Sequence, residues 1–301
     1  MPANNKKFIE KAYLRNADAI VLDLEDSVPD SEKIATREYI KESITLAAKG
    51  GSDVLVRINH TRELLKGDLE ASVWPGLNGI YFPKVESKDQ VKEMDNMLTE
   101  LEDKRGIHVG TIKLGILIES IKGFMNVHEI AVASSRIDSL TLGAEDFALD
   151  TGMEISSATY EAMLIPRMQI LFAARENGIL PLGLMGSLTT YKDTDGFMES
   201  ANLAYKHGFL GASCIHPNNV EILNTSFSPS DVEIDYSKRV IAAFELSLSE
   251  GKAATTLDGK MIDTPHYEIA KKLLMRSTSI EEFELKKNKA REMFLNGGPI
   301  S

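Results

Sequence analysis

The sequence has almost no cysteine and no long apolar run. Cys214 is the one cysteine among 301 residues, which excludes an internal disulfide and suits a reducing cytoplasm. No stretch approaches the roughly 20 apolar residues that a membrane-spanning helix needs, so we expect no membrane partner. The opening residues 1–7 lack the apolar segment of a secretory signal. Together these absences predict a cytoplasmic protein.

Positive charge is scarce as well. The chain carries 34 Lys and Arg residues against 45 Asp and Glu residues, a formal net charge of −11. Proteins that bind nucleic acids need clustered cations to neutralise phosphates, so we expect no nucleic-acid partner. The sequence also lacks a Gly-rich dinucleotide-binding loop after the first predicted strand, which disfavours an open, doubly wound sheet of the nucleotide-binding type.

Apolar runs alternate with helical patterns along most of the chain. These runs are rich in Ile, Val and Leu and mostly lack polar alternation, as is typical of strands covered on both faces. They predict strands at 19–24, 53–58, 79–82, 113–118, 139–142, 179–182 and 211–215. Two of the intervening helical patterns end at a glycine, Gly178 and Gly208. Repeated β-α-β units predict an α/β fold with a parallel sheet, which we interpret as a (β/α)8 TIM-type barrel over residues 1–228.

The strand count is one short of a closed barrel. Residues 1–4 resemble the loop that follows a strand, so we expect the first strand to be missing or truncated. An open, doubly wound sheet of seven strands is the alternative. Residues 229–301 contain two capping-box patterns, at 230–233 and 279–282, which predict helices and no further strand. We expect this C-terminal helical extension to pack on the barrel or to reach a neighbouring subunit.

Two acidic residues follow predicted buried strands. Glu119 comes directly after the strand at 113–118, and Asp146 comes shortly after the strand at 139–142. The carboxyl ends of parallel strands open onto the ligand crevice, and successive strands are neighbours in a barrel. Converging carboxylates without a histidine or cysteine cluster suit a hard divalent ion such as Mg²⁺. We therefore predict that Glu119 and Asp146 are metal ligands; the alternative is that each caps a helix.

Other charged residues lie at the same ends of the predicted strands. Arg57 lies in a buried strand and needs an anion, either a structural carboxylate or, as we favour, the oxygens of a substrate. Glu25 and Asp26 belong to a carboxylate-rich segment that either supports the site or forms a solvated loop. We predict that Lys84 pairs with that segment rather than acting as a Schiff-base nucleophile.

The remaining candidates have plainer alternatives. Lys7 lies on a loop near the same face, where it could meet phosphates or only solvent. Cys214 lies in an apolar run, which favours a packed thiol over a nucleophile. We interpret His216 as structural. Glu145, beside Asp146, is predicted to point away from the metal, towards structure or an acyl carrier.

The ordered motifs of the chain resemble one family. They are ADAIVLDLEDSVP (17–29), VRIN (56–59), FPKVES (82–87), LIES (117–120), LGAEDF (142–147), CIHP (214–217), FSP (227–229) and DGKMID (258–263). In this order they resemble the citrate lyase beta-subunit-like group, which includes malyl-CoA and citramalyl-CoA lyases, within the HpcH/HpaI aldolase superfamily. The resemblance runs from about residue 2 to residue 274. Each motif is weak alone, and the ordered set is specific.

The resemblance implies a (β/α)8 barrel, a homotrimer, Mg²⁺ and acyl-CoA thioester substrates. By motif, Glu119 and Asp146 would be the metal ligands and Arg57 would bind substrate oxygens. Asp263 would reach from the C-terminal extension into a neighbouring subunit's site as the acid/base, and Lys7 would contact CoA phosphates.

The chain departs from the family pattern in two places. The family opens with a strand of the form Arg-Ser-x-Leu-Phe-Val-Pro, of which the final Pro is present here as Pro2, followed by Ala3 and Asn4. Residues 181–183, Pro-Leu-Gly, stand where many relatives have Ile-Asp after the seventh strand, and this change is expected to reshape the pocket.

The expected activity is a Mg-dependent acyl-CoA lyase. It would reversibly cleave the C–C bond of a 3-hydroxy-3-carboxyacyl-CoA of the malyl-, citramalyl- or citryl-CoA type, giving a 2-oxo acid and acetyl-CoA or a similar acyl-CoA. The alternatives are a malate-synthase or thioesterase activity on the same site, a class II aldolase acting without CoA, and a carrier-dependent citrate lyase beta subunit.

Overall fold

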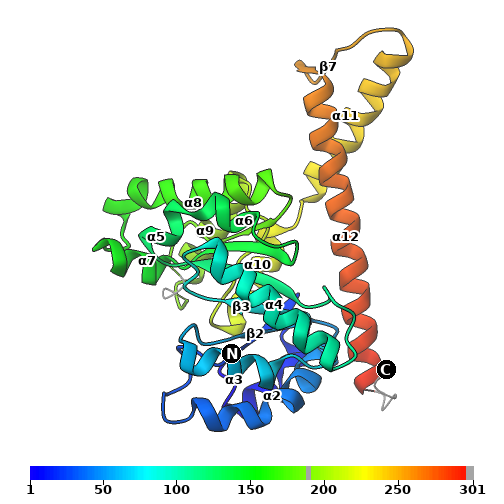
Figure 1. Cartoon of the computed structure of the whole chain (residues 1–301). Helices are drawn as coiled ribbons and strands as arrows, with labels where there is room; N and C mark the ends of the chain where they lie inside the picture. The colour runs from blue at the N-terminus through cyan, green and yellow to red at the C-terminus, as the bar shows by residue number, and fades with distance from the viewer. Residues whose placement is uncertain (188–190, 296–301) are drawn as a thin grey trace. The chain divides into compact units, whose positions relative to one another are not determined.

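The structure is a computed structural model that describes residues 1–187 and 191–295 (Figure 1). It divides into two compact units. The first is Met1–Phe227 together with the last residues from Ala290 onward, and the second is Ser228–Lys289. The expected division into domains 1–228 and 229–301 stays a prediction.

The first unit is built on a parallel sheet whose strands follow one another in chain order. They are β1 (Ala19–Asp23), β2 (Asp53–Arg57), β3 (Gly79–Phe82), β4 (Lys113–Ile118), β5 (Ile137–Leu142) and β6 (Leu180–Leu182). Isolated parallel bridges extend the sheet at both edges, one between Pro2 and Asp23 and one between Leu182 and Gly211. The predicted strand at 211–215 is therefore wrong in extent, because only Gly211 pairs with β6.

Helices connect these strands and pack on the outer side of the sheet (Figure 1). They are α1 (Lys6–Ile9), α2 (Lys33–Ala47), α3 (Arg62–Ser72), α4 (Lys88–Lys104), α5 (Ile121–Met125), α6 (Val127–Ala131), α7 (Ala144–Thr151), α8 (Tyr160–Glu176), α9 (Thr194–His207) and α10 (Val220–Phe227). Local chemistry sets their ends: Ser87 and Gln90 form a capping box at α4, and Gly208 takes the left-handed conformation that ends α9.

Tyr81 shows that the sheet is curled. Its hydroxyl, on β3, donates to Thr141 on β5 at 3.0 Å and interacts with the side chain of Ser213, beyond the Gly211 bridge. In a flat sheet the Gly211 strand would lie about 19 Å from β3, four strand spacings away, which a tyrosine cannot span. The sheet therefore bends round so that distant strands face each other, while the closed eight-stranded barrel stays a prediction.

The main core of the first unit lies in the layer between the strands and the helices. Strand residues such as Leu22, Val56, Ile80, Leu114 and Leu140 are fully buried. The apolar helix faces pack against them in one cluster, and a second cluster lies around α9 and α10. These strand residues share one face of the sheet. On the opposite face Tyr81 and Leu117 are buried while Val21 and Leu55 are half-buried, so that face is less fully covered than the unbroken apolar runs predict.

The second unit contains α11 (Asp231–Ser249), the antiparallel hairpin β7 (Thr255–Leu257) and β8 (Lys260–Ile262), and most of α12 (Thr264–Leu295). Ser230 and Glu233 form the predicted capping box of α11. The expectation of no further strand is wrong, and so is the helix start at 279–282, since α12 runs through it without a break. A Ser-x-x-Glu pattern also fits a helix interior when helix formers flank it.

A small apolar core holds the second unit together. Val240 and Phe244 of α11, Ile262 of β8 and Ala270 of α12 are buried in it. The ring of Phe244 contacts that of Tyr267 at a centroid distance of 5.1 Å, so α11 and the start of α12 pack against each other (Figure 1). No described helix in either unit is long and apolar enough to cross a membrane.

Candidate active site

Charged side chains gather at the carboxyl ends of β1 to β5. Asp23 ends β1, Arg57 ends β2, Lys84 follows β3, Glu119 directly follows β4, and Asp146 lies in the first turn of α7 after β5. In parallel α/β sheets this edge carries the ligand site, because the βα loops there can vary without disturbing the core. The strand order therefore brings together the segments that the sequence singled out.

Arg57 and Asp23 form a two-point ion pair. Arg57 Nε and Nη2 donate to the two carboxylate oxygens of Asp23, both at 2.7 Å. Burial opposes ionisation of Asp23, but its hydrogen bonds with Arg57 outweigh that cost and lower its pKa. Arg57 thus has the structural carboxylate considered as its alternative partner. Its contact with substrate oxygens stays a prediction. The ion pair with Asp23 holds the guanidinium in a fixed orientation.

Glu25 is a buried carboxylate without a hydrogen bond among the described residues. It is 3% exposed, and neither of its carboxylate oxygens has a hydrogen-bond partner. Three cationic or titratable groups surround it: Arg57 Nη1 at 3.2 Å, His60 Nδ1 at 3.5 Å and Lys84 Nζ at 3.6 Å. Burial raises the pKa of Glu25 to about 7, against the attraction of Arg57.

Glu119 is also buried, and the backbone is shaped around it. Its Oε2 accepts the backbone N–H of Lys84 at 2.7 Å, and Lys84 holds the left-handed conformation, φ 53°, in doing so. On its other side lies Gly143, where an added Cβ would sit 2.6 Å from Glu119 Oε1. Burial raises the pKa of Glu119 to about 7, and the nearby charge of Asp146 pushes it in the same direction.

Lys84, after β3, links an acid that follows β1 to an acid that follows β5. Its Nζ lies 3.6 Å from Glu25 and 3.7 Å from Asp146. The predicted ion pair with the segment after β1 is therefore confirmed. Burial lowers the pKa of Lys84, but the surrounding carboxylates, Glu25 first, raise it overall. A Schiff-base lysine needs a lowered pKa, so the geometry counts against that role.

The cluster has the properties of a site for a hard cation. Glu119 and Asp146 interact electrostatically across the same small space, and Glu25 repels Glu119 as well. Among residues 1–187 and 191–295 no group of three His, Cys, Asp or Glu side chains converges as a ready-made metal cage. Two carboxylates are nevertheless enough for Mg²⁺, which usually keeps several waters or substrate oxygens. The residues present thus fit a magnesium ion with Glu119 and Asp146 as its protein ligands and waters or substrate oxygens as the others.

Two other candidates have structural environments. Cys214 is half-buried against the core cluster around α9, and burial raises the pKa of its thiol, so the packed-thiol prediction is confirmed. His216 accepts the backbone N–H of Asn218 and stacks on Tyr191, which confirms its structural role. Neither residue belongs to the carboxylate cluster.

Lys7, Asp263 and Glu145 lie outside the carboxylate cluster. Lys7 is exposed on α1, and its contact with CoA phosphates stays a prediction. Asp263 follows β8 in the second unit, where its Oδ1 lies 2.5 Å from His266 Nδ1. Its role in a neighbouring subunit's site also stays a prediction. Glu145 is exposed and hydrogen-bonded to Ser187, in line with its predicted structural alternative.

Sequence reasoning missed part of the site's support. His60, which faces Glu25, and Gly143, which makes room for Glu119, were not singled out. A signal existed for Gly143, since a glycine just after a strand often marks a close approach of another group. Nothing local could have shown that Glu25 would be buried with no hydrogen bond among the described residues, because its neighbours lie at the ends of two other strands, β2 and β3.

Comparisons with known proteins agree with this architecture. The model of the HpcH/HpaI aldolase/citrate lyase family matches residues 1–217. Citrate lyase subunit beta of Leuconostoc mesenteroides subsp. cremoris is 34% identical over 266 residues, covering 88% of this chain and 87% of that protein. The L-malyl-CoA/beta-methylmalyl-CoA lyase of Cereibacter sphaeroides is 30% identical, over 93% of both chains.

Solved structures give the same result. The CitE protein of Mycobacterium tuberculosis, in complex with magnesium, acetoacetate and coenzyme A, has a TM-score of 0.71 at 28% identity and covers 92% of this chain and 96% of its own. The curled parallel sheet agrees with this structural similarity. The chain belongs to the HpcH/HpaI aldolase/citrate lyase family.

Proposed function

We propose that this protein is a Mg²⁺-dependent acyl-CoA lyase that reversibly cleaves a 3-hydroxy-3-carboxyacyl-CoA to a 2-oxo acid and a shorter acyl-CoA. One observation carries the proposal: Glu119 and Asp146 both contact Lys84 at the carboxyl edge of the sheet, where Asp23 holds Arg57 in place. Family membership makes it a lyase, and relatives named citrate lyase subunit beta and malyl-CoA lyase support the substrate class.

The excess of negative charge supports a bound cation. Two buried carboxyls with pKa values raised to about 7 are costly to ionise together, and a divalent ion removes that cost. Magnesium complexes of the CitE protein of M. tuberculosis, with acetoacetate and with oxaloacetate, agree with such an ion. Bound between Glu119 and Asp146, Mg²⁺ would supply Lewis-acid stabilisation of negative charge on the oxo-acid oxygens.

The protein's own residues would do the rest. Arg57 would hold the carboxylate of the oxo acid, and Asp23 would keep its fork in place through the two-point ion pair. The 3-hydroxyl would lose its proton to water as it becomes the oxo group, the C–C bond would break, and its electron pair would pass to the thioester enolate. Asp263, provided by a neighbouring subunit of a homotrimer, would give its proton to the enolate carbon, and in the reverse direction would take it from the acyl-CoA.

Two alternatives keep specific support. A (3S)-malyl-CoA thioesterase of C. sphaeroides is 31% identical to the chain, which favours hydrolysis on the same site. The similarity to citrate lyase subunit beta favours a subunit that receives its acyl group from a carrier protein. The predicted contact of Lys7 with CoA phosphates applies if the substrate is an acyl-CoA. It does not apply if a carrier protein delivers the acyl group.

A single assay separates these activities. The purified chain with Mg²⁺ is given malyl-, citramalyl- and citryl-CoA, and both the 2-oxo acid and free CoA are followed. Appearance of a 2-oxo acid without free CoA supports the lyase, because the CoA then remains in the shorter acyl-CoA product. Free CoA without a 2-oxo acid identifies a thioesterase, and inertness towards all three that ends on adding carrier and partner subunits identifies the beta subunit of a complex.

A further inference from the structure

Arg167 on α8 is a buried arginine outside the carboxylate cluster. It is 4% exposed, and its one hydrogen bond among the described residues runs from Nη2 to the backbone oxygen of Gly186 at 3.2 Å. A guanidinium has five N–H donors, and burying it without anions is costly. No described carboxylate pairs with it. Burial lowers the pKa of Arg167, and the charges of Tyr160 and Glu145 act in the opposite direction.

Arg136 shows how this chain treats a buried arginine that serves structure. Its side chain is 3% exposed, and it makes hydrogen bonds to Asp95, Thr99, Glu102 and the backbone oxygen of Ile112. Two carboxylates thus neutralise it. Arg167 is buried to a similar degree but donates a hydrogen bond to one backbone carbonyl group only. Its positive charge is therefore uncompensated within the described chain.

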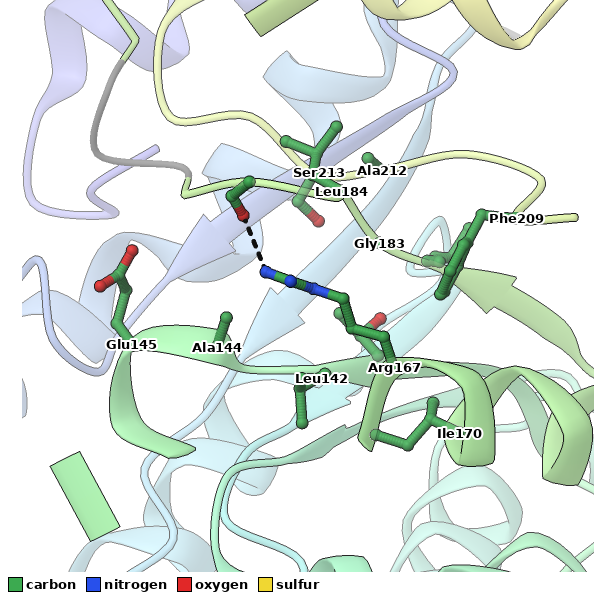
Figure 2. Close-up of a pocket in the computed structure, with 13 residues that line it drawn as sticks. Leu142, Ala144, Glu145, Arg167, Ile170, Gly183, Leu184, Phe209, Ala212 and Ser213 are labelled. Atoms are coloured by element: carbon green, nitrogen blue, oxygen red, sulfur yellow. Dashed lines mark hydrogen bonds between the residues drawn. The ribbon is translucent and has the colours of Figure 1, made fainter. Parts of the chain in front are cut away.

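The guanidinium of Arg167 extends into a small cavity beside the proposed site (Figure 2). The cavity measures about 50 Å³, and its walls include Thr141 of β5, Gly183 after β6, and Ser213. Such a volume suits one small charged group and is far below the several hundred Å³ of a nucleotide-sized pocket. Ala144 and Glu145 also line it, so it shares the first turn of α7 with Asp146.

The nearest acid does not neutralise Arg167. Glu145 lies on the far side of the cavity in Figure 2, is exposed, and is hydrogen-bonded to Ser187. Gly183, which lines the cavity, has no side chain and leaves space there. The cavity therefore combines a buried cation, a hydroxyl-bearing wall and room for a carboxylate.

We propose that Arg167 is a specificity residue that binds a second carboxylate of the 2-oxo acid, so that the site prefers dicarboxylic over monocarboxylic oxo acids. The inference rests on the proposed function, since it needs the first carboxylate to be held beside Glu119 and Asp146. It adds to that function a second anion-binding position that shares the first turn of α7 with Asp146.

Calorimetric titration of the whole protein in the presence of Mg²⁺ tests the proposal. The probes are two pairs matched in carbon number: freshly prepared oxaloacetate against 2-oxobutyrate, and 2-oxoglutarate against 2-oxopentanoate. In at least one pair the dicarboxylic acid should bind the wild-type protein about tenfold more tightly or better. Arg167→Met should bring that ratio close to one. Arg175→Met, on the same helix but bonded to the Gly208 carbonyl, should leave the ratio unchanged.

Gly183→Asp provides a second variant that does not remove the buried cation. An added Cβ there meets the buried ring of Phe209 at 3.1 Å, so we expect the substitution to need a shift of a few tenths of an ångström in that ring. The new carboxylate should pair with Arg167, raise the melting temperature and abolish the preference for dicarboxylic acids. Both results together support the subsite.

Failure of the subsite and failure of the proposed function give different results. If no oxo acid binds the wild-type protein with Mg²⁺, the proposed function is wrong and the subsite with it. If oxo acids bind but the ratio is near one, or is the same in wild type, Arg167→Met and Gly183→Asp, then Arg167 is structural and only the subsite is overturned.

Discussion

Glu119 and Glu25 are the residues whose ionisation the fold opposes most clearly at this site. Both are buried at the carboxyl edge of the sheet, and burial raises the pKa of each from the usual 4.5 to about 7. The sequence predicted that acids would gather here, because the strand ends are visible in the apolar pattern. It could not predict that they would be this poorly solvated, since burial depends on neighbours far along the chain.

The metal-free protein should lose stability as the pH rises from about 4.5 to 7. In that range the folded state holds more protons on Glu119 and Glu25 than the unfolded state does, so the free energy of unfolding falls with increasing pH. One pKa unit corresponds to about 1.4 kcal/mol. Glu119→Gln should flatten this part of the profile, as measured by thermal unfolding in EDTA. An unchanged slope in the variant would argue against a raised pKa.

Mg²⁺ should stabilise the wild-type protein more at pH 8 than at pH 5. The cation binds the ionised carboxylates, which below pH 7 must first release their protons. Melting temperatures with and without Mg²⁺ at both pH values measure the effect. Glu119→Gln should remove most of the increase at pH 8, and a full increase in that variant would exclude Glu119 as a ligand.

Arg57→Lys should damage the site although the charge is kept. An ammonium cannot reproduce the two parallel bonds to Asp23, so the cation would lose its orientation. We expect kcat/KM to fall by about two orders of magnitude, the usual cost of losing an aligned charge-stabilising donor. Arg136→Lys is the matched control, because Arg136 pairs with Asp95 and Glu102 just before β5 begins, at the opposite end of the strand from the cluster. It should lower stability by about 1–3 kcal/mol and leave kcat/KM nearly unchanged.

Among the elements, the βα connections decide the geometry of the site. The strands β3 and β4 have the predicted limits, and the other strands of the sheet differ from prediction by one or two residues at an end. Long apolar runs bounded by helical patterns make such elements recognisable from sequence. The segment after Gly211 and the helix α12 were mispredicted. An apolar run need not complete a strand, and a capping-box pattern does not by itself end a helix.

Gly143→Ala should weaken metal binding without unfolding the protein. A Cβ at this position would lie 2.3 Å from Glu119 Cγ, so Glu119 would have to move away from Asp146. Calorimetry should show Mg²⁺ affinity reduced by about tenfold or more, as for other changes that displace a ligand. Gly211→Ala is the control, since its Cβ would meet only a Leu182 methyl group at 3.3 Å. Equal Mg²⁺ affinity in both variants would show that Gly143 does not position Glu119.

At the scale of the whole molecule, the proposed acid/base residue is on the second unit and the metal site is on the first. Asp263 lies at the junction of β8 and α12, where His266 contacts its carboxylate. Its assignment came from the resemblance of the DGKMID motif, since nothing in its own spacing connects it with Glu119. Each unit has its own apolar core, made of residues from that unit's own part of the sequence.

Mixing two inactive variants should restore activity if Asp263 acts across a subunit boundary. Asp263→Ala should lose orders of magnitude in turnover while still binding Mg²⁺, and Glu119→Gln should lose metal binding. When the two variants are co-expressed, about one quarter of the sites should combine an intact Glu119 with a neighbour's intact Asp263. Cleavage assays on the purified mixture measure the recovery. No recovery in a mixed oligomer would place Asp263 outside the neighbour's site.

The sequence by itself determined the alternation of strands and helices, the acids at the strand ends and the family, because these depend on local patterns and short ordered motifs. The tertiary structure decided which charges meet: Arg57 with Asp23, Lys84 between Glu25 and Asp146, and Arg167 with no carboxylate of the described residues. Solvation and pairing depend on distances between segments brought together by the curl of the sheet, and no local pattern contains those distances.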